Sequence, residues 1–230
     1  MSKIIDTTNI DKLVKFDCDL LKYYKVKYIV GVDEVGRGSL VGPVVAGASL
    51  FKSDLNLARL WYEPIIKLND SKKLNPKQRK IIDLNLQNLC YRAIGSSDVA
   101  EIDTINIYNA TKLAMKRSVL NLLASLCTAI NEFDLDECLI LIDGNMKIDD
   151  LNYCNITLKT QSVVKGDNFS ASIAAASVTA KVYRDNLIVN LAQDFPNYKL
   201  DVHKGYATQF HRQAIAQFGL TKIHRKSFKT

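Results

Sequence analysis

Two apolar stretches near the N-terminus have the pattern of buried strands. Residues 26–34 (VKYIVGVDE) are rich in β-branched residues and end at the first pair of carboxylates, which predicts a buried strand. Residues 40–51 (LVGPVVAGASLF) predict a second strand, with a break or bulge at Gly42-Pro43 near its start. Because only a few residues separate the two stretches, we expect them to pair antiparallel. The preceding residues, 1–26, form a lead-in of helical character.

The rest of the chain alternates between strand and helix patterns. Further strands are predicted at 89–97, 137–143, 156–160 and 162–166. Capping residues and the helical spacing of apolar residues predict five helices: Asn75 to about Gln87, Asp98 to Asp103, a long helix capped by Asn106, 170–193, and Thr208 to Gly219. This alternation predicts an α/β domain with a central mixed β-sheet flanked by helices. We expect one domain over residues 1–230, with a C-terminal helical region from about residue 195.

Charge and cysteine content narrow the class of protein. The 31 basic residues exceed the 24 acidic ones and give a net charge of +7, which favours a polyanionic partner without establishing one. The five cysteines are widely spaced and form no C-x-x-C pair, so we expect neither a zinc site nor disulfides. We expect each to be a small core residue. No apolar run is long enough for a membrane span, and the pattern is that of a cytoplasmic protein.

Four acidic residues stand at strand ends or helix starts. Asp33 and Glu34 end the first strand, Asp143 ends ECLILI, and Asp167 precedes the alanine-rich helix. Strand ends are where sites are built in α/β sheets, although a single aspartate at such a place can equally be a turn or cap residue. Carboxylates that converge repel one another unless cations hold them, and oxygen ligands favour Mg²⁺ or Mn²⁺ over zinc. Two such ions can drive a phosphoryl displacement.

The neighbouring Asp33 and Glu34 raise a question of geometry. Successive side chains of a regular strand point to opposite faces, so both carboxylates cannot aim inward from such a strand. Either the strand bends before Gly36, or Glu34 contributes its backbone carbonyl. The sequence leaves both alternatives open.

Other segments could bind a polyanion. In Gly36-Arg37-Gly38-Ser39 the two glycines allow close backbone approach, and the amides and the Ser39 hydroxyl could contact phosphate or ribose oxygens. Lys72, in DSKKL, could touch phosphates, and Tyr206, in HKGY, could stack on a sugar or base. Each also has a simpler interpretation as a turn or a surface residue. The three histidines lack the spacing of a helical ligand pair, so a histidine metal site is not expected.

The ordered motifs together resemble those of bacterial ribonuclease HII. They are GVDEVGRGSLVGPVVAGA, DSKKL, EID, LIDGN, VVKGD, SIAAASVTAK, HKGY and HRKSF, and they span residues 28–228. The one departure, SIAAASVTAK, keeps polar positions at Ser172 and Ser177. Because few residues precede the first strand, we do not expect the N-terminal domain of the related ribonuclease HIII.

The resemblance implies a ribonuclease H-like fold and a two-metal site of Asp33, Glu34, Asp143 and Asp167. It also implies that Gly36, Arg37 and Gly38 sense the 2′-hydroxyl of a ribonucleotide and that Tyr206 stacks on the next deoxyribose. The implied substrates are RNA–DNA hybrids and DNA duplexes that contain ribonucleotides.

Two other functions are compatible with parts of this pattern. A junction resolvase of the same fold would share the acids but need no 2′-hydroxyl sensor. A non-catalytic nucleic-acid-binding module would be expected to have lost at least one acid, and none is missing here. We expect a monomer. A sliding clamp could be a partner of a repair enzyme, but the tail after Phe228 contains no clear docking motif.

Overall fold

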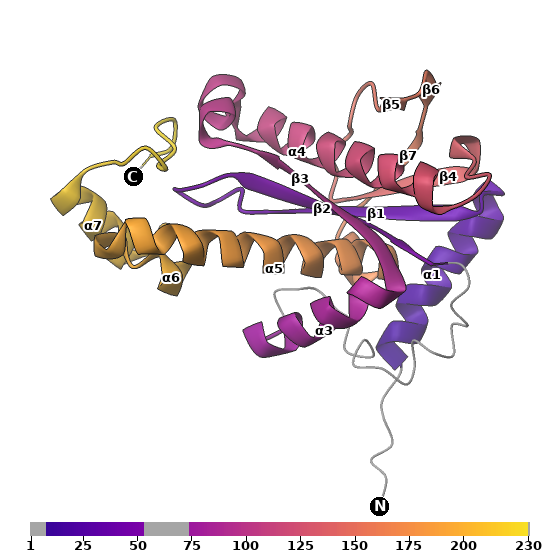
Figure 1. Cartoon of the computed structure of the whole chain (residues 1–230), viewed down its shortest axis with the longest axis horizontal. Helices are drawn as coiled ribbons and strands as arrows, with labels where there is room; N and C mark the ends of the chain where they lie inside the picture. Colours follow the sequence, from indigo (N-terminus) through magenta and orange to yellow (C-terminus); the bar gives the residue numbers. More distant parts are fainter. Residues whose placement is uncertain (1–7, 53–73, 230) are drawn as a thin grey trace, which may run out of the picture.

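A five-stranded mixed sheet lies at the centre of the molecule. The computed structural model describes residues 8–52 and 74–229 (Figure 1). The strand order is β3-β2-β1-β4-β7. Its strands are β1 (Tyr28–Val35), β2 (Val44–Phe51), β3 (Cys90–Ser97), β4 (Cys138–Asp143) and β7 (Lys159–Val163), and a separate hairpin joins β5 (Asn152–Tyr153) to β6 (Ile156–Thr157). The predicted α/β class and mixed sheet are confirmed.

Helices cover both faces of this sheet. They are α1 (Thr8–Tyr24), α3 (Pro76–Leu89), α4 (Val99–Ala129), α5 (Ala171–Asp194), α6 (Leu200–His203) and α7 (Gln209–Phe218), with 3₁₀ turns η2 (Leu135–Glu137), η3 (Gly166–Asn168) and η4 (Pro196–Tyr198). Helix α4 lies along one face, and α5, with α1 and α3, lies along the other (Figure 1). The result is a three-layer arrangement whose sheet is buried on both sides.

The alternation of side chains along β1 and β4 explains the two buried layers. Val32 and Ile142 belong to the core beneath α4, whereas Ile29 and Leu141 pack with Ile173 of α5. Both faces are apolar, so the strands are continuous apolar runs, as is typical of doubly covered parallel strands.

The strand pairing sets the geometry of the candidate site. β1 pairs antiparallel with β2, as predicted, and parallel with β4, with Val32 opposite Ile142. β4 in turn pairs parallel with β7. The carboxyl ends of β1, β4 and β7 therefore lie at the same end of the sheet.

Several predicted boundaries need correction. Leu89 is the last residue of α3 and not the first of β3, because the amphipathic helix continues two residues beyond Gln87 and buries Leu89. The predicted strand 156–160 is divided between β6 and β7, and only Ser162 and Val163 of 162–166 are extended, because η3 begins at Gly166. Of the predicted strand 40–51, only Val44 onward joins the sheet; Gly42-Pro43 interrupts it as expected.

The cysteines are only partly a core feature. All five are free thiols. Cys90 and Cys138 are buried, but Cys127 and Cys154 are exposed, so the expectation that each is a core residue is wrong for those two. Among the described residues, no helix is both long and apolar enough to cross a membrane.

The C-terminal region returns to the sheet after α7. Its helices enclose a separate apolar cluster that includes Tyr198, Leu200 and Ile215. Phe228 packs against this cluster and also against the core beneath α4. The carboxylate of Asp103 accepts hydrogen bonds from the Lys226 and Ser227 amides, at 3.0 and 2.9 Å. The tail is thereby fastened to the start of α4.

A kink divides α4 at the predicted cap. Asn106 has φ 66° and ψ 164°, and its side chain accepts hydrogen bonds from the amides of Tyr108 and Asn109 at 3.0 and 3.1 Å. The sequence prediction of two helices meeting there is confirmed.

We expect Asn106→Ala to lower the free energy of unfolding by about 1–2 kcal/mol, because the cap is lost and alanine adopts positive φ poorly. Asn106 is exposed, so no core packing is disturbed. Urea unfolding measures the change. Asn106→Gly is the matched control and should cost less than alanine, since glycine tolerates this backbone. Equal stability of the alanine variant and the wild type would contradict this account.

Candidate active site

Three of the predicted acids meet at the carboxyl ends of β1 and β4. Because Val32 lies opposite Ile142 in the parallel pair, the following residues, Asp33 and Asp143, are neighbours on the face covered by α5. Carboxylate oxygens of Asp33, Glu34 and Asp143 lie within 4.8 Å of one another. The predicted convergence of these three acids is therefore present in the structure.

Asp167 reaches the same place through the turn after β7. Lys165 adopts a left-handed conformation (φ 56°), and the amide of Gly166 donates to Oδ1 of Asp143 at 2.6 Å. Asp167 is 7% exposed, and Asn168 donates to its carboxylate at 2.8 Å. Its negative charge raises the pKa of Asp33, so the fourth acid acts electrostatically on the cluster, although it is not among the three acids whose oxygens lie within 4.8 Å of one another.

The geometry of Glu34 matches neither a bend of the strand before Gly36 nor a contribution through its backbone carbonyl. β1 stays regularly paired with β2 through Val35, so no bend precedes Gly36. The Glu34 side chain nevertheless brings an oxygen within 4.8 Å of the other two carboxylates, since the cluster lies at the open end of the strand. Asp33 turns back and accepts the amide of Glu34 at 2.7 Å. Glu34 can thus contribute its side chain.

The electrostatics of the cluster favour the binding of a cation. Burial raises the pKa of Asp33 well above its ordinary value, and the charges of Glu34, Asp143 and Asp167 raise it further, while a hydrogen bond from Ser177 opposes the rise. Bringing such carboxylates together without a counter-charge costs free energy. The donor set consists of carboxylate oxygens, which fits Mg²⁺ or Mn²⁺ better than softer metals.

The Gly36–Ser39 loop follows directly from the acid cluster. Gly36 has φ +92°, and a Cβ there would lie 2.1 Å from Nε of Arg184, so only glycine fits. Arg37 is exposed and donates to Glu34 at 3.3 Å. Ser39 is fully buried, and its hydroxyl donates to the carbonyl of Val41 at 3.0 Å. That hydroxyl could contact a ligand only after breaking this bond.

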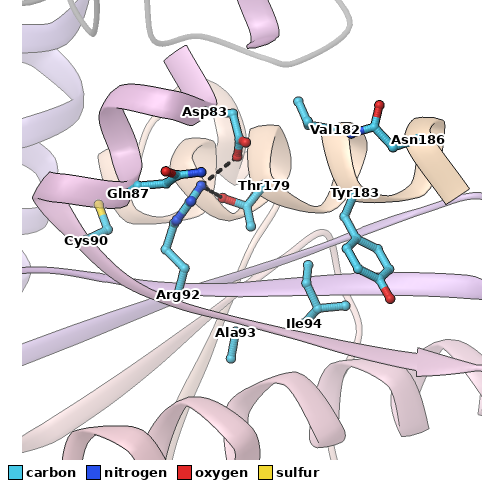
Figure 2. Close-up of a pocket in the computed structure, with 10 residues that line it drawn as sticks. All are labelled: Asp83, Gln87, Cys90, Arg92, Ala93, Ile94, Thr179, Val182, Tyr183 and Asn186. Carbon is cyan, nitrogen blue, oxygen red and sulfur yellow. Dashed lines mark hydrogen bonds and ion pairs between the residues drawn. The ribbon is translucent and has the colours of Figure 1, made fainter. Parts of the chain in front are cut away.

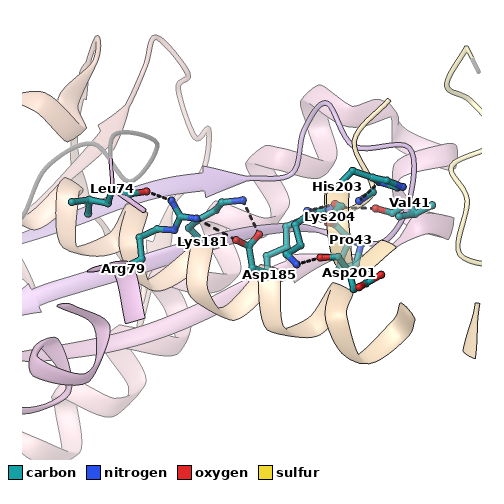
Figure 3. A network of polar contacts seen from close by, with 11 residues as sticks. Val41, Pro43, Leu74, Arg79, Lys181, Asp185, Asp201, His203 and Lys204 are labelled. Atoms are coloured by element: carbon teal, nitrogen blue, oxygen red, sulfur yellow. Dashed lines mark hydrogen bonds and ion pairs between the residues drawn. The ribbon is translucent and has the colours of Figure 1, made fainter. Parts of the chain in front are cut away.

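Two buried arginines hold the loop and the segment that follows it. Arg184 donates to the carbonyls of Pro43, Lys204 and Val41 at 3.2, 3.2 and 3.1 Å; these three acceptors are labelled in Figure 3. Arg225 donates to the carbonyls of Gly42 and Arg37, each at 2.9 Å. Both side chains are fully buried, and burial lowers the pKa of Arg225 to about 9. The hydrogen bonds of both guanidinium groups go to backbone carbonyls, and Nη2 of Arg225 is buried without a hydrogen-bond partner in the part of the chain that the structure describes.

Tyr206 lies beside this loop. Ser39 and Tyr206 form an isolated antiparallel bridge, and the Leu40 amide donates to the Gly205 carbonyl at 2.9 Å. The ring of Tyr206 has Nζ of Lys181 at 5.7 Å and the guanidinium carbon of Arg184 at 5.8 Å from its centroid. The structure thus brings together Tyr206 and the loop, which are far apart in the sequence.

A cleft of about 540 Å³ connects these features. Its lining comprises Asp33, Glu34, Val35, Gly36, Arg37, Gly38, Arg79, Ser177, Lys181 and Tyr206. Sequence reasoning had not singled out Arg79 or Lys181. Ser177 and Lys181 are four residues apart on α5, which places them on one helical face, and this spacing was the available signal. Asp185 holds both cations, with Lys181 at 2.7 Å and Arg79 at 3.8 Å (Figure 3).

A second hollow lies elsewhere and lacks an acid cluster. It is bounded by α3, β3 and α5 (Figure 2). Its carboxylate, Asp83, is paired with Arg92 at 2.6 Å, and Arg92 also donates to Thr179 at 3.0 Å. These polar groups are already satisfied by one another, so the cleft at Asp33 is the better candidate for chemistry.

One predicted substrate contact cannot be placed. Lys72 and most of its DSKKL segment lie outside the described residues. Its role stays a prediction.

Comparison with protein families identifies the chain. The family profile described as Ribonuclease HII matches residues 30–230. The chain belongs to the ribonuclease HII family. It is therefore a member of a family of metal-dependent hydrolases, the type 2 ribonucleases H, in agreement with the predicted enzyme class.

Curated relatives are similar over most of their length. Ribonuclease HII of Pelagibacter ubique is 41% identical over 203 residues, which cover 88% of this chain and 96% of the relative. Ribonuclease HII of Fusobacterium nucleatum is 43% identical over 212 residues, which cover 90% and 89% of the two chains.

Solved structures of ribonuclease HII and HIII share the fold. Ribonuclease HII of Archaeoglobus fulgidus, solved in a complex with PCNA, superposes with a TM-score of 0.67 at 22% identity and covers 89% of this chain and 96% of that one. Ribonuclease H2 of Pyrococcus horikoshii gives 0.64 at 23% identity, with 88% and 94% covered. A Bst-RNase HIII structure in complex with Mn²⁺ gives 0.58 at 19% identity, with 83% and 70% covered. These similarities confirm the predicted ribonuclease H-like fold.

We expect Mg²⁺ or Mn²⁺ to raise the melting temperature of the ribonuclease. A ligand at about 100 times its Kd stabilises by about 2.7 kcal/mol, which corresponds to a rise of roughly 5–10 °C for a chain of this size. Asp33→Asn should melt higher than wild type without metal, because one charge of the repelling cluster is removed, and should respond less to metal. Differential scanning calorimetry measures both.

The exposed Asp194 at the end of α5 offers a matched control. Asp194→Asn should leave the metal response unchanged. An equal metal response in Asp33→Asn and wild type would exclude Asp33 as a ligand.

Proposed function

We propose that this enzyme is an endoribonuclease that hydrolyses the RNA strand of RNA–DNA hybrids and incises on the 5′ side of ribonucleotides embedded in duplex DNA. The observation that carries the proposal is that two acids of the cluster, Asp33 and Glu34, line one cleft together with a glycine-flanked arginine and Tyr206. The family match and the relatives named ribonuclease HII support it.

The acids would hold two Mg²⁺ or Mn²⁺ ions. When bound, such ions supply an activated water and stabilise the leaving oxygen of the phosphodiester. Ser177 donates to Asp33, and the Gly166 amide donates to Asp143, so both carboxylates are oriented before metal arrives. Because the nucleophile is water and not the adjacent 2′-hydroxyl, the products carry a 5′-phosphate and a 3′-hydroxyl.

Recognition of the ribose would fall to the backbone of the Gly36–Ser39 loop. Gly38 is exposed and has nothing within 4 Å of the position where a Cβ would stand, so a substrate sugar can approach the peptide closely. The 2′-hydroxyl distinguishes RNA from DNA and can both donate and accept hydrogen bonds. The contact of Arg37 with Glu34 couples this loop directly to the acid cluster.

The remaining lining residues suit a nucleic-acid backbone. Tyr206 would stack on the deoxyribose that follows the ribonucleotide. Lys181 and Arg79, both held by Asp185, would face phosphates, which provide most of the affinity of such complexes. Lys72 is retained as a further phosphate contact.

The assembly is proposed to be a monomer located in the cytoplasm and acting in DNA replication and ribonucleotide excision repair. The Archaeoglobus fulgidus relative was solved with PCNA, so a sliding clamp could bind this enzyme as well.

The decisive experiment uses three substrates, each with Mg²⁺ and, separately, Mn²⁺. They are a duplex with a single ribonucleotide, an all-DNA control duplex, and an all-DNA four-way junction. We expect incision of the first alone, 5′ of the ribonucleotide, leaving a 5′-phosphate. Asp33→Asn should reduce the rate by at least about 10³-fold, because a metal ligand is lost, with unchanged circular dichroism. Asp194→Asn should retain full activity. Cleavage of the junction without cleavage at the ribonucleotide would overturn the proposal in favour of a resolvase.

A separate prediction concerns Lys181. Replacing it with methionine should weaken duplex binding and lower the slope of log K against log salt concentration by about 1, as expected for the loss of one phosphate contact. Fluorescence anisotropy over a salt series measures the slope. Lys112→Met is the matched control, because Lys112 is paired with Asp149 at 2.6 Å on α4, on the opposite face of the sheet. Equal slopes for Lys181→Met and wild type would rule out the contact.

A further inference from the structure

The strip of chain after the Gly36–Ser39 loop is held between two distant segments. On one side the Leu40 amide donates to the Gly205 carbonyl at 2.9 Å, beside the Ser39–Tyr206 bridge. On the other side Val41 forms a bridge with His224, the Arg225 amide donates to Leu40, and the Gly42 amide donates to Ile223, each of these two bonds at 2.9 Å. The position of Tyr206 relative to the loop therefore depends on how these two flanking segments are joined.

His211 and His224 make that junction. Both rings are buried, with 0% and 1% exposure, and their Nε2 atoms are 3.3 Å apart. Nδ1 of His211 lies 3.0 Å from the Tyr206 carbonyl. On the far side, the Thr221 amide donates to Nδ1 of His224 at 3.0 Å. A continuous path of hydrogen bonds thus runs from the C-terminal segment to the backbone of Tyr206.

The backbone neighbours determine the proton positions on both rings. A peptide N–H only donates, so the Thr221 amide favours a bare Nδ1 on His224 and a proton on its Nε2 when the ring is neutral; the Thr221 hydroxyl, 2.8 Å from the same Nδ1, can donate to it as well. A carbonyl only accepts, so Nδ1 of His211 carries the proton and its Nε2 is bare. The two Nε2 atoms are then a donor and an acceptor that face each other. A second proton on either ring would oppose two donors and break the path.

The surroundings favour the neutral pair. His203 stacks on His211 with ring centroids 4.5 Å apart, and its own nitrogens are bonded to the Tyr198 carbonyl and the Gly205 amide. The ring of Tyr198 packs against His211 and His224 at 6.4 and 5.0 Å. Burial lowers the pKa of His224 to about 4 and also lowers that of His211, with nearby charge from Arg212 acting in the same direction on His211. Among the described residues, the hydrogen-bond and ring contacts of both histidines include no carboxylate that would favour the charged form.

We propose that the neutral His211–His224 pair is a positioning element that holds Tyr206 against the Gly36–Ser39 loop and thereby sets how well the enzyme reads the sugar of its substrate. The inference rests on the proposed function for the substrate contact of Tyr206. The acids are held by β1, β4 and η3, which the pair does not touch, so it acts on recognition and leaves the metal cluster in place.

Substitutions at His224 separate positioning from simple packing. His224→Leu fills similar space but removes the donor to His211; His224→Gln keeps an amide donor in a similar place. We expect His224→Leu to raise KM for a single-ribonucleotide duplex about tenfold with little change in kcat, and His224→Gln to recover most of the loss. The coupling to Tyr206 is tested with Tyr206→Ala alone and combined with His224→Leu. If the pair acts through Tyr206, the second substitution adds less than twofold in the Tyr206→Ala background.

A full tenfold effect of His224→Leu on top of Tyr206→Ala would overturn the proposal, as would a His224→Leu enzyme with wild-type KM. If His224→Leu fails to fold, His224→Gln still tests the proposal when its KM is compared with those of wild type and Tyr206→Ala. His224→Gln keeps the donor, so a loss of recognition in this variant without loss of Tyr206 packing would contradict the proposal.

Nitrogen-15 NMR of the wild-type protein at neutral pH provides a test that needs no activity. We expect protonated Nε2 on His224 and protonated Nδ1 on His211. Either opposite tautomer, or a charged ring, would overturn the proposal. If the tautomers are as expected but no duplex is cut, the proposed function has failed and the hydrogen-bonded junction has not.

Discussion

The parallel pairing of β1 with β4 is the constraint on which the site depends. A shift of one residue would send every side chain of a strand to the opposite face, and the buried layers beneath α4 and α5 both fix the register. In the observed register Asp33 and Asp143 are adjacent, and β7 delivers Asp167 through η3. The free energy that holds repelling carboxylates together therefore comes from apolar burial along the strands, and it is recovered in part when a cation binds.

The loop beside the acids has a different kind of support. It has no sheet of its own. The Arg37 carbonyl within it accepts a hydrogen bond from the buried Arg225, and the carbonyls of residues 41–43, which follow it, accept from Arg184 and Arg225. Burying a guanidinium group is costly unless its donors are satisfied, so these side chains favour a backbone arrangement that directs carbonyls toward them, although Nη2 of Arg225 is buried without a hydrogen-bond partner among the described residues. Both arginines come from segments far along the chain, α5 and the tail. The tail is consequently part of the support of the loop although it lies far from the loop in sequence.

Much of the fold and of the acid cluster could be predicted from the sequence, because the signals are local. Asn75, Asp98 and Asn106 cap helices where their side chains reach nearby amides, and a strand that ends in an acid places that acid at the edge of a parallel sheet. The boundary at Leu89 was missed because helix and strand patterns are both apolar there.

The supports of the loop could not be predicted in the same way. Arginine is read as a surface residue, and nothing near Arg184 or Arg225 in the sequence indicates that carbonyls distant along the chain will surround it. The Ser39 hydroxyl was expected at the surface for a related reason, since its acceptor, the Val41 carbonyl, becomes available only in the folded turn. Lys181 was hidden within a helix whose alanines dominate the pattern, and its role follows only from its position beside Ser177 and Tyr206.

The acids are held by strands and the loop is held by buried arginines, and this difference has a functional consequence. Asp33, Glu34 and Asp143 lie on the strands β1 and β4. Such rigid elements suit a metal site, because carboxylates displaced by even about 1 Å lose the geometry needed for catalysis. The loop is held instead by a hydrogen bond from the buried Arg225 to the Arg37 carbonyl and, just after the loop, by one from Arg184 to the Val41 carbonyl. Arg37 connects the two parts through Glu34, so a sugar that fits the loop and one that does not would leave the acid cluster in different surroundings. Under the proposed function, recognition of the ribose by the loop would therefore be coupled to the acid cluster through the contact of Arg37 with Glu34.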